Sequence, residues 1–99
     1  MDLNYWRDEF GRLAEQKFTH MGPSDRLLSV YRQLADVSGC IHKAQDLIST
    51  DSEKYEQLDH RITAAIADLF ILAKVCDADL DREIIKVIAW YSSRPSIGN

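Results

Sequence analysis

This chain lacks an excess of basic residues over acidic ones. Its 99 residues include 12 lysines and arginines against 16 aspartates and glutamates, a formal net charge of −4 at pH 7. A protein that binds nucleic acid broadly needs a basic face for the phosphates, so this class is disfavoured. No apolar run approaches the roughly 20 residues that cross a bilayer, and no charged-then-apolar leader opens the chain. We therefore expect a cytoplasmic protein with neither a membrane nor a nucleic-acid partner.

The common short motifs of catalytic and metal-binding sites are also missing. There is no glycine-rich phosphate loop, no CxxC pair and no histidine-rich metal motif. The three histidines, His20, His42 and His60, have no ligand spacing and are interpreted as surface or half-buried residues. Cys40 and Cys76 lie in apolar helical stretches, so we expect buried thiols of a reducing compartment rather than a disulfide or metal pair.

Turn-forming residues are few, with two prolines and four glycines, and helical periodicity runs through the whole sequence. The pattern predicts an all-α protein with one domain over residues 1–99. We expect Asp2 to cap the first helix and Asp77 or Asp79 to cap the last. Short connections favour an antiparallel four-helix bundle, and so short a chain is expected to complete its core by oligomerisation, as a dimer or tetramer. The predicted helices are residues 2–19, 24–48, 51–76 and 80–93.

The stretch from Arg61 to Cys76 is apolar on almost every side of a helix. A helix that is apolar all round has to be covered all round, so this stretch is expected to form the central helix. One acid, Asp68, lies in its middle. A buried carboxylate without a partner costs several kcal/mol, so Asp68 should face a cation, a hydrogen-bond donor or a water-filled cleft.

A second acid, Asp36, lies on a side face of the preceding helix. If the two helices pack antiparallel about a turn near residues 49–52, Asp36 and Asp68 come level to within about one helical turn. Two level carboxylates can hold Mg²⁺ or Mn²⁺, since hard cations prefer oxygen ligands. From spacing alone, a solvated Asp36 and an Asp68 paired with arginine or lysine are the favoured interpretation.

Two segments resemble a known family. Residues 30–37, VYRQLADV, and residues 64–73, AAIADLFILA, are similar to the all-α nucleoside triphosphate pyrophosphohydrolases of the MazG type. That family has an ExxE motif on one helix and an ExxD motif on the next, and the four acids bind the Mg²⁺ ions that hold the nucleotide. Its sites form between subunits. The helix order and the closing Arg94-Pro95 also look similar, so the resemblance extends over about residues 3–95.

The resemblance implies roles for individual residues. Asp36 and Asp68 would bind metal, and Gln33 would orient a metal-bound water. Lys86 and Arg94 would contact the phosphates, and Trp90 would bind beside them or stack on the base. At helical spacing, Trp90 is equally typical of a core or interface position.

The motifs here are degenerate, because two of the four expected acids are absent. Gln33 and Ala65 stand where the family has glutamate, and Trp90 stands where it has asparagine. Replacement acids among Glu53, Glu56 and Asp59 are better interpreted as a solvated face. Any Mg²⁺ or Mn²⁺ would therefore be bound weakly.

Two functions follow from the resemblance, and a third does not depend on it. The first is Mg²⁺-dependent hydrolysis of an NTP or dNTP to the monophosphate and pyrophosphate. The second is an inactive relative that acts as an oligomeric nucleotide-sensing or protein-interaction module. The third is an unrelated helical interaction module, because four-helix patterns are common.

Overall fold

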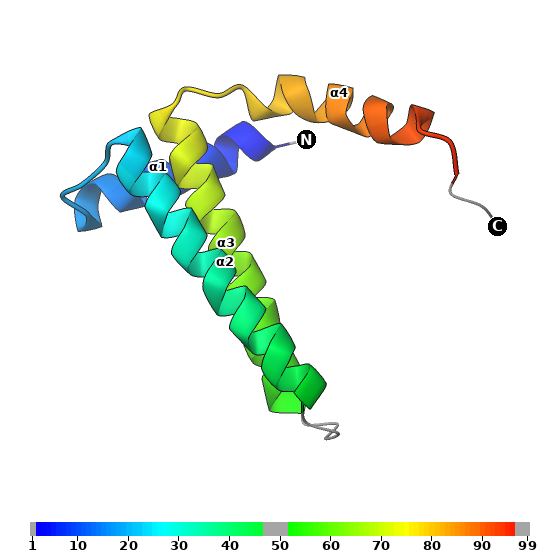
Figure 1. Ribbon diagram of the computed structural model, residues 1–99. Coiled ribbons are helices and arrows are strands. Elements are labelled where there is room, and N and C mark those ends of the chain that lie inside the picture. The colour runs from blue at the N-terminus through cyan, green and yellow to red at the C-terminus, as the bar shows by residue number, and fades with distance from the viewer. Residues whose placement is uncertain (1, 47–51, 97–99) are drawn as a thin grey trace.

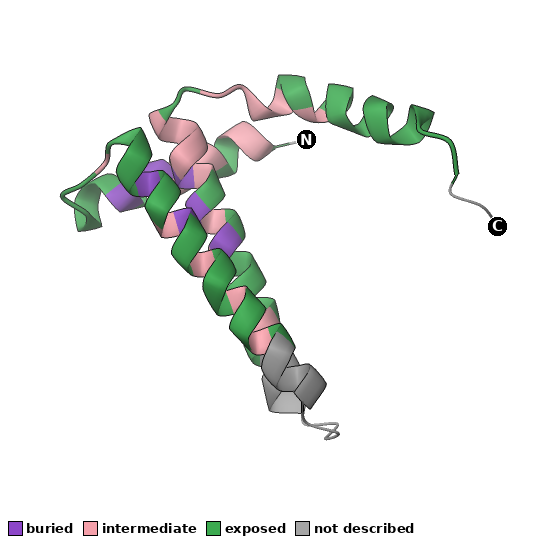
Figure 2. Cartoon of the chain, in the orientation of Figure 1, coloured by how far each residue is buried: buried purple, intermediate pink, exposed green. Residues whose placement is uncertain are grey.

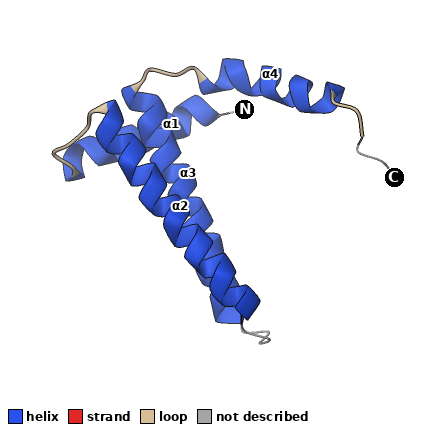
Figure 3. Ribbon diagram, viewed as in Figure 1, coloured by secondary structure: helices blue, strands red, loops and turns tan. Residues whose placement is uncertain are grey.

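The computed structural model describes residues 2–46 and 52–96 of the chain, and side chains within 2–41 and 57–96. It confirms the all-α class, since no strand occurs among the described residues (Figure 3). The predicted helix positions are confirmed to within two residues where the structure describes them, and the predicted bounds at residues 48 and 51 lie outside the described residues. The helices are α1 (Leu3–Lys17), α2 (Pro23–Asp46), α3 (Ser52–Val75) and α4 (Leu80–Ser93).

Helices α2 and α3 form a long antiparallel hairpin, and α1 lies across one end of it (Figure 1). Pro23 opens α2 at the first helical position, where a missing N–H costs nothing. The α1–α3 contact includes Phe10 stacked on Phe70, with ring centroids 5.9 Å apart. Helix α4 runs away from the hairpin, so the expected four-helix antiparallel bundle is not completed within this chain.

The N-termini of α1 and α4 cap each other. The Asp81 carboxylate of α4 accepts hydrogen bonds from the backbone N–H groups of Leu3 (2.8 Å) and Asn4 (3.2 Å) at the start of α1. In return, Asn4 Oδ1 accepts from the backbone N–H of Leu80 (2.8 Å), and Asn4 Nδ2 donates to Asp79 Oδ1 (3.0 Å). Each helix therefore satisfies free N–H groups of the other.

One of the two predicted caps is confirmed. Asp79 caps α4, where its side chain accepts from the backbone N–H of Arg82 at 3.1 Å. Asp2 occupies the predicted N-cap position of α1, but its side chain makes no capping bond within the described residues. Asp81 takes that role, and sequence spacing gives no indication of it because the partner is 78 residues away.

The interior of the chain is small. Among the described side chains, the buried apolar ones are Ala14, Val30, Ala65 and Ile71 (Figure 2). Helix α3 was expected to be covered on all sides, but Ile66 and Leu69 are 46% and 48% exposed. None of the described residues of α4 is buried. Apolar surface thus remains uncovered on α3 and α4, and exposed apolar residues occur on α1 and α2 as well.

Its shape is correspondingly extended. The accessible surface is 7699 Å², whereas a compact monomer of 11.4 kDa exposes roughly 5,800 Å². The radius of gyration is 16.4 Å against about 13 Å for a compact domain of this length. None of the described helices is long and apolar enough to cross a membrane.

Gly11 allows α1 to approach α3 closely. A Cβ at this position would lie 2.5 Å from Lys74 Cγ and 2.9 Å from Lys74 Cβ, close to the α3 backbone. We expect Gly11→Ala to lower the free energy of unfolding by about 1–2 kcal/mol, because overpacking outweighs the gain in helix propensity. Gly39→Ala is the matched control, since a Cβ there meets nothing within 4 Å, and it should stabilise by about 0.5–1 kcal/mol. Urea unfolding of both variants measures the difference, and equal effects would contradict this close approach.

The mutual caps should be visible in a carboxyl titration. The hydrogen bond from Asn4, followed by that from the Arg82 N–H, holds the pKa of Asp79 below its ordinary value of 3.8. A depressed pKa adds stability above the ordinary value, and this contribution is lost as the pH falls through the folded-state pKa. We expect Asn4→Ala to raise the pKa of Asp79 in a carbon-detected NMR titration. An unchanged Asp79 pKa in that variant would argue against the contact.

Candidate functional site

Asp68 lies between α3 and α2 and is only 8% exposed. The hydroxyl of Ser29 on α2 donates to Asp68 Oδ2 at 2.9 Å. The sequence predicted that this acid needs a cation, a donor or a wet cleft, and the donor is the one present. The contact of Ser29 with Asp68 could not be predicted from the sequence, because it depends on the register of α2 against α3.

Arg26 is the other buried charged residue among those described, also 8% exposed. It lies one turn before Ser29 on α2, and its guanidinium carbon is 4.8 Å from the centroid of the Phe18 ring. Its Nε and Nη1 atoms have no hydrogen-bond partner in the described part of the chain. No ion pair joins Arg26 to Asp68 in the described residues. The contact with the Phe18 ring is the interaction that offsets the burial of the guanidinium charge.

Asp36 is exposed and belongs to a different pair. Arg61 Nη1 of α3 lies 3.4 Å from Asp36 Oδ2, and both side chains are about half exposed. An exposed pair of this kind contributes at most about 1 kcal/mol. Asp36 therefore lies on the solvent side of the hairpin, not in its interior.

The two cross-helix contacts fix the register of α2 against α3. Ser29 is opposite Asp68 and Asp36 is opposite Arg61, so the two acids are two turns apart, about 10 Å along the hairpin. The expectation that Asp36 and Asp68 are level within about one turn is wrong in the single chain. Ligand bonds to Mg²⁺ are about 2.1 Å, so one ion does not bridge both carboxylates in this arrangement.

Ala65 and Gln33, the residues that the resemblance places at the two missing acids, were expected to lie near Asp68 and Asp36. Ala65 is buried and contributes to the core. Gln33 is half-buried, and its Oε1 atom is buried without a hydrogen-bond partner in the described residues. No group of three or more histidine, cysteine, aspartate or glutamate side chains that could hold a metal ion occurs among the described residues.

Three oxygen-bearing side chains thus remain at the seam, from Ser29, Gln33 and Asp68. They carry a single negative charge between them, which suits hydrogen bonding better than the binding of several ions. Asp59, considered above as a replacement acid, is exposed on α3. The side chains of Glu53 and Glu56 lie outside the described residues.

The three residues considered for nucleotide contacts are on α4. Lys86 Nζ is 3.3 Å from Glu83 Oε1, and the Arg94 guanidinium carbon lies 4.6 Å from the centroid of the Trp90 ring. All three are exposed, and α4 extends away from the hairpin (Figure 1). The chain by itself does not bring them to Asp68.

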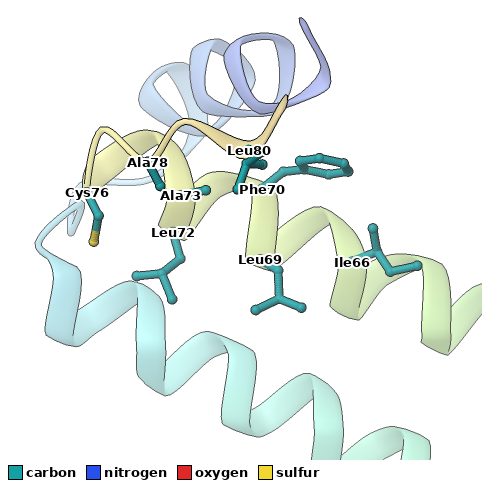
Figure 4. Close-up of a pocket in the computed structure, with 8 residues that line it drawn as sticks. All are labelled: Ile66, Leu69, Phe70, Leu72, Ala73, Cys76, Ala78 and Leu80. Carbon is teal, nitrogen blue, oxygen red and sulfur yellow. The ribbon is translucent and has the colours of Figure 1, made fainter. Parts of the chain in front are cut away.

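Sequence reasoning missed an apolar pocket beside α3. Its volume is about 390 Å³, and every lining side chain is apolar or a thiol (Figure 4). Cys76 is exposed at this pocket, so the expectation of a buried thiol is wrong there, whereas Cys40 is half-buried; both are free. The sequence did contain an indication of this pocket. A helix that is apolar all round carries more apolar surface than the other three helices of so short a chain can cover. The lining residues are Ile66, Leu69, Phe70, Leu72, Ala73, Cys76, Ala78 and Leu80.

Comparisons with protein-family models, curated proteins and solved structures found no match to this chain.

The burial of Asp68 makes Ser29 energetically important. We expect Ser29→Ala to lower the free energy of unfolding by about 2–3 kcal/mol, because it leaves a buried carboxylate without its donor. The loss should be clearly smaller in an Asp68→Asn background. The exposed pair is the matched comparison: Arg61→Ala and Asp36→Ala should couple by less than about 1 kcal/mol. Chemical unfolding of both double-mutant cycles gives the two coupling energies, and a larger value for the exposed pair would refute this assignment.

Proposed function

We propose that this chain is a MazG-like helical protein that acts as a homo-oligomeric module and does not hydrolyse nucleotides by itself. The observation that carries this proposal is the separation of its two remaining acids. Asp68 is bound by Ser29, and Asp36 is paired with Arg61 two turns away. The free thiols Cys40 and Cys76 fit a reducing, cytoplasmic setting.

Pyrophosphohydrolysis makes demands that these residues meet poorly. Metal ions are needed to neutralise the triphosphate and to activate a water molecule. Ala65 and Gln33 supply no negative charge, and the charge of Asp36 is balanced by Arg61. Only the Asp68 carboxylate remains, so the chain lacks the charge that would hold two divalent ions against a nucleotide.

The oligomeric part of the proposal rests on uncovered apolar surface. The accessible area exceeds that of a compact monomer by roughly 1,900 Å², and obligate homodimers bury about 1,000–2,500 Å² on each partner. Exposed apolar residues occur on all four helices, and the largest exposed fractions are found on α2 and α4. These include Leu28, Tyr31, Leu34, Ile66, Leu69, Ile85, Ile88, Trp90 and Tyr91.

A second candidate is the Mg²⁺-dependent pyrophosphohydrolase, converting an NTP or dNTP to the monophosphate and pyrophosphate. It is favoured by the unpartnered Gln33 Oε1 near the seam that also holds Ser29 and Asp68, since this leaves a free oxygen ligand beside a carboxylate. In this candidate a partner copy supplies the missing acids, and Lys86, Trp90 and Arg94 contact the nucleotide.

Pyrophosphate release separates the two candidates. Across a full panel of NTPs and dNTPs with Mg²⁺ or Mn²⁺, we expect no release above that of a heat-unfolded sample. Neither metal should raise the melting temperature, because the seam carries one unshared charge.

Release that Asp68→Asn abolishes would overturn the non-catalytic proposal and favour the hydrolase. Asp59→Asn is the matched control, since it removes an exposed acid from the same helix and should leave any such activity unchanged.

A further inference from the structure

The direction of α4 is fixed at its first turn. Besides the mutual caps with Asn4, the side chain of Arg7 donates from Nη1 to the backbone carbonyl of Ala78 at 2.6 Å. Asp79 and Asp81 are tied to the start of α1 by the hydrogen bonds described above. Folding α4 back along its own α3 would break these contacts together. The chain is therefore built to hold α4 away from its own hairpin.

The exposed α4 is amphipathic. Ile84, Val87, Ile88 and Tyr91 fall on one side of the helix within about 100° on a helical wheel. Ile84 is half-buried, but Val87, Ile88 and Tyr91 are exposed, so most of this side is uncovered by the described residues. Lys86 lies well off this face, on the charged side of the helix. A helix of this kind gains stability mainly from packing its apolar side against a partner.

The apolar pocket has the form of a groove along α3. Ile66, Leu69, Phe70, Ala73 and Cys76 recur at steps of three and four residues, so they follow one side of α3 (Figure 4). From Ile66 to Cys76 this stripe is about 15 Å long, and α4, with 14 residues, is about 21 Å long. The stripe thus matches most of the length of α4.

We propose that α4 of a second copy of this chain lies in the α3 groove, and that the first copy returns its own α4 to the second. This inference rests on the proposed oligomer and specifies which surfaces form it. Reciprocal exchange is isologous, so the pair closes on itself as a dimer. The α4 helix of the partner then completes the bundle formed by α1, α2 and α3 of the first copy.

A second copy covers the α3 groove and the apolar face of α4 with one contact. An unrelated peptide in the groove would leave the α4 face exposed, and a partner for α4 alone would leave the groove open. Exchange covers the apolar face of α4 and the α3 groove on each copy. Burial of this kind is consistent with the roughly 1,900 Å² of excess accessible surface per chain.

Disulfide trapping with the native thiol of the groove tests the exchange. In a Cys40→Ser background, cysteine is placed singly on the apolar face of α4 by Ile84→Cys, Val87→Cys, Ile88→Cys or Tyr91→Cys. A disulfide to Cys76 needs Cα atoms within about 7 Å. Under mild oxidation, at least one variant should give a cross-linked dimer at ten times or more the yield of Lys86→Cys, the control on the charged side.

The parent carrying Cys76 alone controls for a direct link between two groove thiols, and adding Cys76→Ser should abolish the cross-link. Sedimentation velocity before oxidation reports the oligomer independently. A dimer without preferential trapping on the apolar face would overturn the exchange and leave the oligomeric module standing. A monomer, or a link within one chain, would overturn the exchange, and a monomer would also overturn the module.

Discussion

A shortage of burial within the single chain governs this structure. Four apolar residues, all on α1, α2 and α3, make up the described core, and α4 adds nothing to it. The α2–α3 hairpin is covered on one side by α1 and open on others (Figure 2). A domain of about 100 residues is marginal even when compact, because burial has to offset the entropy of ordering the chain. The remaining apolar surface is the observation on which the proposed oligomer rests.

The charged interior follows from the same hairpin. Asp68 is tolerated because Ser29 donates to it across the seam, and Arg26 is shielded by the ring of Phe18. These two buried charges lie about one turn apart in the register of the hairpin, yet they do not form an ion pair in the described structure. The arrangement leaves a polar seam between α2 and α3, and the neighbouring Ala65 is buried in the core.

Local features were well predicted from the sequence. Helix positions follow from periodicity and turn residues, and the Asp79 cap follows from the residues just after it. The errors concern contacts between distant segments. The register of α2 against α3 depends on the turn between them, so counting residues from an assumed turn misjudged the distance between Asp36 and Asp68. The cap from Asp81 to α1 and the outward course of α4 depend on residues more than 70 positions apart. The expectation that Asp68 needs a partner is confirmed by Ser29, whereas the expectation that Cys76 is buried is wrong.

The oligomeric account is tested most directly by the dependence of unfolding on protein concentration. If the chain completes its core with a second copy, the folded state is inseparable from assembly, and the melting temperature should rise steadily over a hundredfold increase in concentration. The loss of helical circular dichroism and the loss of the oligomer should then occur together. A melting temperature that stays constant over that range, with a folded monomer throughout, would contradict the account.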